Sequence, residues 1–127
     1  MNEIMKGIDA ARLDAGTGAD GTMEGRYLFT EGFAGFAGHF PGAPILPAVV
    51  QVLTAVMLVG ECEGRRQRLV AVQDAKFLNP VLPGQELRIS CKSRMTRGRL
   101  LYEARIAAGE AVAATMLLEL APAEVAQ

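Results

Sequence analysis

A mostly apolar stretch, PAVVQVLTAVMLVGEC at residues 47–62, constrains the fold most. It is long enough for about four helical turns, and Pro47 suits a first helical position, where its missing N–H costs nothing. Gly60 indicates the end of the helix. The frequent valines are also compatible with a strand, but the length and the lack of polar alternation favour a helix. Because nearly every side of it is apolar, we expect this helix to be enclosed by the rest of the protein.

The residues after this helix predict strands. Residues 68–120 contain four segments of strand composition separated by Asn-Pro, Arg-Gly and Gly-Glu turns, and one earlier strand is expected near residues 23–29. The first 20 residues form an N-terminal segment with a flexible break at GTGADG, residues 16–21. A length of 127 residues fits one domain. We therefore predict a single α+β domain over residues 1–127, with an antiparallel sheet around a central helix.

The charge of the protein excludes one class of partner. Its formal net charge is −1, whereas proteins that bind nucleic acids through the phosphate backbone need a strongly basic surface. Arginines still gather at residues 65–68 and along residues 88–99. A solvated face is the ordinary explanation, and a contact surface for an acidic partner or a phosphate group is the alternative.

Cysteine use and hydropathy indicate the compartment. Cys62 and Cys91 have no metal-ligand spacing, so we expect no metal and a reducing environment. The opening MNEIMKGIDAARLDA lacks the apolar core of a signal peptide. The longest apolar run, Ala43 to Gly60, is interrupted by Pro44, Pro47, Gln51 and Thr54, which disfavours a membrane span of ~20 residues. A cytoplasmic protein that does not contact a membrane is expected.

The sequence has one histidine, His39. A lone histidine is usually structural, but here glycines precede it and Phe40, Pro41 and Gly42 follow it just before the predicted helix. The free N–H groups and the positive dipole of a helix amino end stabilise a developing oxyanion. A base with a pKa near neutrality beside such donors is suited to removing a proton next to a carbonyl.

Two blocks resemble the motifs of one family. GHFPGAPILPAVV at residues 38–50 and AKFLNPVLPGQELRI at residues 75–89 are similar, in order and spacing, to the motifs of the β-hydroxyacyl-acyl-carrier-protein dehydratases. The resemblance implies a hotdog fold, a long antiparallel sheet wrapped around a central helix. It also implies a dimer with active sites at its interface, no metal or organic cofactor, and an acyl carrier protein as partner. The acyl group and the phosphopantetheine arm would lie in a tunnel.

The resemblance also assigns roles to residues. His39 would be the base that removes the α-proton of a 3-hydroxyacyl thioester, and the backbone N–H of Ala48, where the family has glycine, would hold the thioester carbonyl. A rigid start to the helix is the simpler explanation for the matching loop residues, and a core position is the simpler one for the helix residues. The substrate contacts implied are Phe40, Gly42, Val49, Val52 and Leu53.

Leu53 is a departure from the family. The family carries a catalytic Glu or Asp fourteen residues after the histidine, and leucine at this position has no proton to donate. Gln51 points about 200° away from it around the helix, and Glu61 lies about 12 Å further along. Thr54 is a poor proton donor. Asp74 and Glu31 stay open as replacements for the acid, if the fold brings either of them to this position.

These residues leave three hypotheses. The first is a lyase, a 3-hydroxyacyl-acyl-carrier-protein dehydratase of fatty-acid or related polyene or polyketide synthesis, in which His39 acts without the usual acid. The second is a weakened, thioester-binding subunit that forms a homodimer or pairs with a paralogue whose acid completes the site. A thioesterase ranks third, because it normally needs a carboxylate to activate water. Loss of a general acid lowers a rate by about 10² to 10⁴, so the first hypothesis predicts slow turnover.

Overall fold

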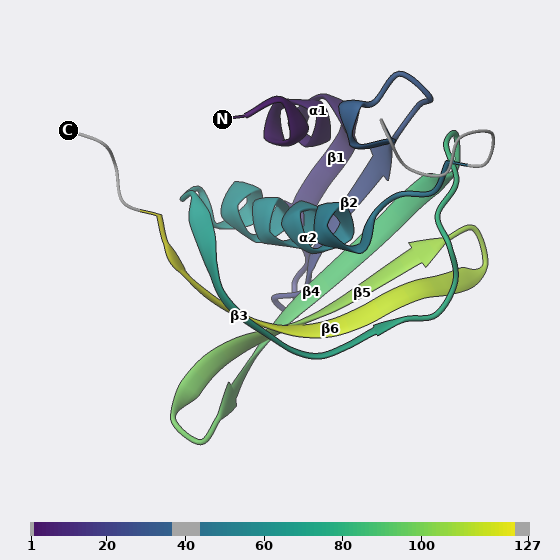
Figure 1. Ribbon diagram of the computed structural model, residues 1–127. Coiled ribbons are helices and arrows are strands. Elements are labelled where there is room, and N and C mark those ends of the chain that lie inside the picture. Colours follow the sequence, from purple (N-terminus) through teal and green to yellow (C-terminus); the bar gives the residue numbers. More distant parts are fainter. Residues whose placement is uncertain (1, 37–43, 124–127) are drawn as a thin grey trace.

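A computed structural model describes residues 2–36 and 44–123. These residues form a sheet of six antiparallel strands in the order β1-β2-β4-β5-β6-β3, which curls around the helix α2 (Figure 1). The predicted α+β architecture, with a sheet around a central helix, is confirmed. The helices are α1 (Glu3–Ala11) and α2 (Ala48–Glu63), with a short 3-10 helix η1 (Ala34–Phe36). The strands are β1 (Arg12–Thr17), β2 (Met23–Leu28), β3 (Gln67–Phe77), β4 (Glu86–Thr96), β5 (Arg99–Ala108) and β6 (Ala111–Pro122).

The central helix begins at Ala48, one residue later than the sequence pattern indicates, because Pro47 has extended backbone angles and occupies the N-cap position. Its end is set by Gly64, which has a positive φ of 69°. Gly60 does not end the helix. A Cβ atom on Gly60 would lie 3.1 Å from the carbonyl oxygen of Arg65, so this glycine permits a close approach of the segment that leaves the helix.

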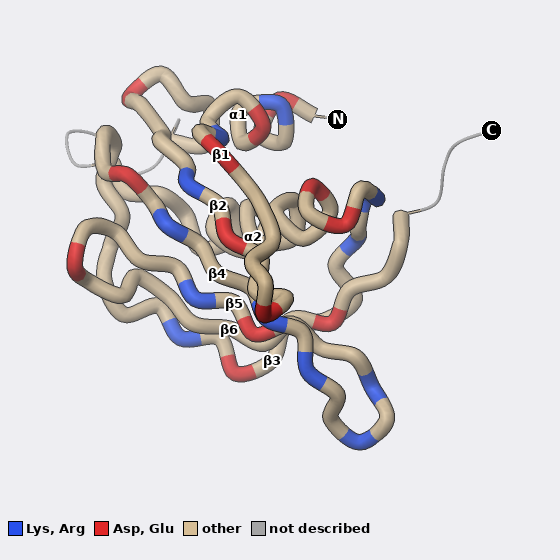
Figure 2. The backbone as a smooth tube through the Cα atoms, turned by 180° about the vertical axis from the view of Figure 1, so that it is seen from behind, with Lys and Arg blue, Asp and Glu red and all other residues tan. Residues whose placement is uncertain are grey.

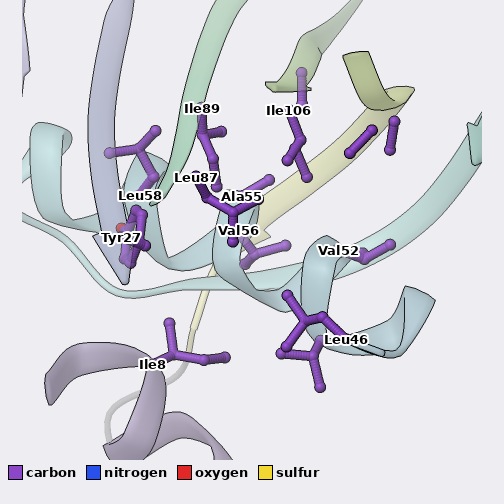
Figure 3. Packing of buried hydrophobic residues seen from close by; sticks show 14 of the residues in the cluster. Ile8, Tyr27, Leu46, Val52, Ala55, Val56, Leu58, Leu87, Ile89 and Ile106 are labelled. Carbon is purple, nitrogen blue, oxygen red and sulfur yellow. The ribbon is translucent and has the colours of Figure 1, made fainter. Parts of the chain in front are cut away.

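The hydrophobic core lies between α2 and the concave face of the sheet (Figure 3). Side chains of α2 meet residues that alternate along the strands, and α1 adds Ile8, which is fully buried. Burial of each large apolar side chain contributes about 1.5–3 kcal/mol, so this layer is the main source of stability. The residues labelled in Figure 3 are Ile8, Tyr27, Leu46, Val52, Ala55, Val56, Leu58, Leu87, Ile89 and Ile106.

One side of α2 is open, so the expectation of a fully enclosed helix is wrong. Val49 is 64% exposed, and Leu53 and Met57, one and two turns further on, are only partly buried. The opposite side of the helix carries the buried residues Gln51, Ala55 and Leu58. The open side is apolar and lacks a covering layer in the described part of the protein.

The N-terminal segment contains more regular structure than its sequence indicates. Residues 12–17 form β1, which pairs with β2, so the expected break at residues 16–21 is reduced to a turn after Thr17. In this turn the Asp20 carboxylate accepts a hydrogen bond of 3.0 Å from the Thr22 N–H. The sequence pattern misses β1 because both of its faces are partly exposed, which removes the usual apolar alternation.

The strand β3 lies at the other edge of the sheet and is irregular. It pairs only with β6 in the described residues, and its register shifts between Gln73 and Lys76. At this bulge Asp74 has a positive φ of 49°. Several apolar side chains of the strand are exposed, namely Leu69, Val70, Val72 and Phe77. Among residues 2–36 and 44–123, one edge strand and one side of α2 are therefore apolar and uncovered.

Candidate functional site

The two sequence blocks meet at the amino end of α2. The Leu46 N–H donates a hydrogen bond of 2.8 Å to the carbonyl oxygen of Val81, which ties the first block to the second. Beside this contact lies a groove of about 440 Å³. Its lining residues are Ile45, Leu46, Pro47 and Ala48 from the first block, Gln51 directly after that block, and Phe77, Leu78, Asn79 and Pro80 from the second block.

The amino end of α2 carries donors that the described residues leave unused. The N–H groups of Val50 and Gln51 donate to the carbonyl oxygen of Pro47 at 3.1 and 3.2 Å. Those of Ala48 and Val49 make no hydrogen bond to any residue in 2–36 or 44–123, and the ring of Pro47 cannot cap them. Together with the positive end of the helix dipole, they provide a binding position for an oxyanion or a carbonyl oxygen.

The predicted site residues fall into three groups. Ala48 and Val49 are exposed at the helix amino end, while Leu53 lies on the same side as Val49 and is half-buried. Val52 is 7% exposed and packs in the core. His39, Phe40 and Gly42 lie outside the described residues.

Gln51 is a site feature that sequence reasoning considered only as a substitute acid. Its side chain is 4% exposed, and its Nε2 donates a hydrogen bond of 3.3 Å to the carbonyl oxygen of Leu46. Its Oε1 is buried and has no hydrogen-bond partner among the described residues. The signal that could have identified it is an uncharged polar residue inside an otherwise apolar helical turn.

The other polar residues of α2 considered as replacements for the acid are engaged elsewhere. The Thr54 hydroxyl donates a hydrogen bond of 2.7 Å to the carbonyl oxygen of Val50. Glu61 lies 3.6 Å from the Arg12 guanidinium. The groove has no titratable side chain among its described lining residues. The chemistry available there consists of backbone N–H groups and the amides of Gln51 and Asn79.

Charged residues of both signs are interspersed over the outer face of the sheet (Figure 2). Arg26 pairs with Asp14 at 2.6 Å and with Glu86 at 3.1 Å, and Arg94 pairs with Glu103. The exposed arginines that follow α2, residues 65 and 66, lie at its carboxyl end, about 24 Å from its amino end at 1.5 Å per residue. Within one subunit, these two arginines do not border the groove.

The described residues offer neither a metal site nor a membrane span. No cluster of three His, Cys, Asp or Glu side chains there is arranged to hold a metal ion. None of the helices in that part of the protein is both long and apolar enough to cross a membrane.

Comparison with known proteins decides the family. Residues 16–116 match the model of the ApeI-like family, described as ApeI dehydratase. The chain belongs to this dehydratase family. The resemblance drawn from the two sequence blocks is thereby confirmed at the level of the family.

Curated relatives are similar over part of their length. A 3-hydroxyacyl-acyl-carrier-protein dehydratase FabZ from Granulibacter bethesdensis is 36% identical over 108 residues, which cover 72% of this chain and 63% of the relative. One from Alkalilimnicola ehrlichii is 32% identical over 90 residues, which cover 62% of this chain and 58% of the relative. The chain thus spans less than two thirds of either relative. These matches support a dehydratase-like protein.

A solved structure confirms the hotdog fold. The protein described as the dehydratase heterocomplex ApeI:P from Xenorhabdus doucetiae superposes with a TM-score of 0.70 at 18% identity. The superposition covers 86% of this chain and 95% of that one. The shared fold extends over nearly the whole of both proteins.

Proposed function

We propose that this protein removes water from a 3-hydroxyacyl thioester carried by an acyl carrier protein, in fatty-acid or related polyene or polyketide synthesis. The observation that carries the proposal is the groove at the amino end of α2, where both family blocks meet beside the unused N–H groups of Ala48 and Val49. Those donors suit the oxygen of a thioester carbonyl. Membership of a dehydratase family supports the reaction type.

The reaction needs two groups from this protein. The Ala48 N–H donates a hydrogen bond to the thioester carbonyl oxygen and so stabilises the negative charge that develops when the α-proton leaves. His39 takes that proton, the C–H electron pair forms the Cα=Cβ bond, and the Cβ–O bond breaks. The proton held on the His39 imidazolium then passes to the departing hydroxyl, so that water leaves and the base is restored.

The acyl group is assigned to apolar residues near the same helix end. Val49 and Leu53 lie on the open side of α2, where they form an apolar wall, and Val52 packs behind them in the core. Phe40 and Gly42, from the first family block, complete the proposed substrate contacts. Leu53 makes this wall more apolar, and it stands where the family has its catalytic Glu or Asp.

A second candidate is a subunit that binds the thioester and needs a related subunit to complete the site. Leu53 favours it, because the position of the family acid faces the open side of α2, which a second subunit would cover. The apolar edge strand β3 offers a place for that subunit to pair. The solved relative from Xenorhabdus doucetiae is described as a heterocomplex, which supports the same arrangement here.

Turnover of a medium-length 3-hydroxyacyl-carrier thioester, followed by mass spectrometry for loss of water, tests the two candidates. For the first, we expect slow turnover by the purified protein and none by the His39→Ala variant. For the second, we expect turnover only after Leu53→Glu or on addition of a related subunit. Turnover that survives His39→Ala would contradict the assigned base. Release of free 3-hydroxy acid would instead indicate a thioesterase.

A further inference from the structure

Gln51 holds an acceptor in a fixed orientation. Its Nε2 donates to the Leu46 carbonyl oxygen, and rotating the amide by half a turn would place Oε1 against that same oxygen, acceptor against acceptor. The orientation is therefore set by the protein. Oε1 is left buried, without a partner among the described residues, in a side chain that lines the groove.

This arrangement is costly for the isolated protein. A buried polar atom without a hydrogen bond costs about 1–3 kcal/mol, and folded proteins contain few of them. The neighbouring turns of α2 are apolar, so an apolar side chain would fit position 51 without this cost. A donor that reaches Oε1 recovers the lost interaction, which makes the atom a strong acceptor for a ligand.

The acceptor also lies beside the unused donors. Helical side chains lean toward the helix amino end, so the Gln51 amide lies over the turn that begins at Ala48. The backbone N–H donors and the Gln51 carbonyl acceptor thus lie within about one helical turn of each other, ~5.4 Å. This pattern is complementary to a ligand that carries a carbonyl oxygen and, a short distance away, an N–H.

We propose that Gln51 Oε1 accepts a hydrogen bond from the amide N–H of the arm that carries the thioester. The inference rests on the proposed function, because it places the thioester carbonyl at the Ala48 N–H. A two-carbon spacer separates the thioester sulfur from this amide nitrogen, which matches the short separation of donor and acceptor in the groove. Gln51 then fixes the arm relative to the reacting carbons without touching them.

The opposite wall of the groove permits the arm to enter. Phe77 and Leu78 are 44% and 56% exposed, so few contacts resist a shift of their side chains. Such a shift is required, because Oε1 is closed to water in the isolated protein. Phe77 and Leu78 belong to the second family block, and Gln51 directly follows the first.

Binding of two saturated acyl-pantetheine thioesters tests the inference, since neither has a 3-hydroxyl group to lose. One keeps the amide N–H next to the thioester, and the other has an ester oxygen in its place. Calorimetry should show that the native protein prefers the amide by about tenfold, equivalent to one hydrogen bond of ~1.4 kcal/mol. The Gln51→Met variant, which keeps the length of the side chain but has no acceptor, should bind both ligands equally.

Controls separate this role from a structural one. Thr54→Val also removes a buried polar group from α2, but one whose hydrogen bond is internal, so it should keep the tenfold preference. An equal loss of affinity for both ligands in Gln51→Met, or an unchanged preference, would overturn the inference, as would failure of the native protein to bind either ligand. The native protein could prefer the amide ligand through Gln51 and yet release no water from a 3-hydroxyacyl thioester. That combination would support the inference and reject the proposed reaction.

Discussion

Individual cysteines differ in accessibility within the same fold. Cys91 is fully buried between β2 and β5, and burial raises the pKa of its thiol to about 12. Cys62 is only partly buried, although burial raises the pKa of its thiol as well. Because the thiolate is the reactive form and must reach the reagent, Cys62 should be modified first.

Labelling with a chromogenic disulfide reagent at pH 8 checks this order. We expect one thiol per native molecule to react at a measurable rate and the second to react only in denaturant. In Cys62→Ser the native protein should be almost unreactive. Rapid labelling of that variant would show that Cys91 is more accessible than its burial indicates.

Tyr102 connects the sheet to the end of α2. Its hydroxyl donates a hydrogen bond of 2.9 Å to the Glu63 carboxylate, in a part-buried position. Removing the hydroxyl in Tyr102→Phe should lower the free energy of unfolding by about 1–2 kcal/mol, measured by urea denaturation, because the acceptor is charged. Glu63→Gln, which keeps an acceptor of the same shape, should cost less. Equal stability of Tyr102→Phe and the native protein would contradict a contribution from this bond.

Sequence reasoning predicted the site residues through the family blocks, since types and spacing of residues are visible in a sequence. It could not identify the unpaired state of Gln51 Oε1, because that depends on where the Leu46 carbonyl lies. Val52, one of the predicted substrate contacts, packs in the core, the position that sequence reasoning gave as the simpler explanation for the helix residues. On a helix that is apolar all round, sequence alone does not show which side meets the sheet.

Among the elements, α2 ends at a glycine whose backbone has the left-handed conformation that glycine adopts readily. Gly64 has a φ of 69°, and its N–H bonds back to the last turn of the helix. A Cβ atom disfavours this left-handed conformation, so Gly64→Ala should lower the free energy of unfolding by about 1 kcal/mol. Gly16→Ala is a matched control, because Gly16 lies in β1 without a positive φ, and a Cβ atom there would have no neighbour within 4 Å. If Gly16→Ala lowered the free energy of unfolding by as much as Gly64→Ala, the left-handed conformation of Gly64 would not be the cause.

The elements that the sequence predicted best have either a long uninterrupted apolar run, as in α2, or a regular alternation, as in β4. The helix predicted at residues 47–62 is found at Ala48–Glu63, and β4 shows the expected alternation, with Leu87, Ile89 and Cys91 buried. The strand β1 was missed because it is exposed on both faces, and the break expected there is a short turn. Edge strands lack the burial that produces a readable pattern.

At the level of the whole molecule, we expect a dimer that uses the open edge. The described part of β3 has exposed apolar side chains and no partner on its outer side, a combination that favours pairing with another strand. Val70→Lys should shift the protein toward monomer in analytical ultracentrifugation. Leu13→Lys places the same charge at a residue of similar exposure on β1, at the other edge of the sheet, and should leave the assembly unchanged. Equal behaviour of the two variants would contradict an interface at β3.

The stability of the whole molecule should fall at alkaline pH. Burial, then the hydrogen bond to Glu63, raises the pKa of Tyr102 from 10.0 to about 12, and burial raises that of Cys91 from 9.0 to about 12. Below pH 9 both groups are neutral in the folded and unfolded states, so their contribution is complete. Between pH 9 and 12 the unfolded protein ionises first, and stability is lost as pH rises. Thermal melts from pH 7 to 11 check this prediction. Relative to its own value at pH 7, the melting temperature should fall more steeply with pH in the native protein than in Cys91→Ala.

The bulge in β3 has a consequence for the choice of partner. Between Gln73 and Lys76 the regular ladder is interrupted, and Asp74 has a left-handed backbone conformation in place of an extended one. A neighbouring strand can therefore align only at offsets that avoid this interruption, or with a matching irregularity of its own. In a cell that makes several related proteins, the bulge would restrict which of them can pair with β3. The selection would depend on backbone geometry as well as on side-chain contacts.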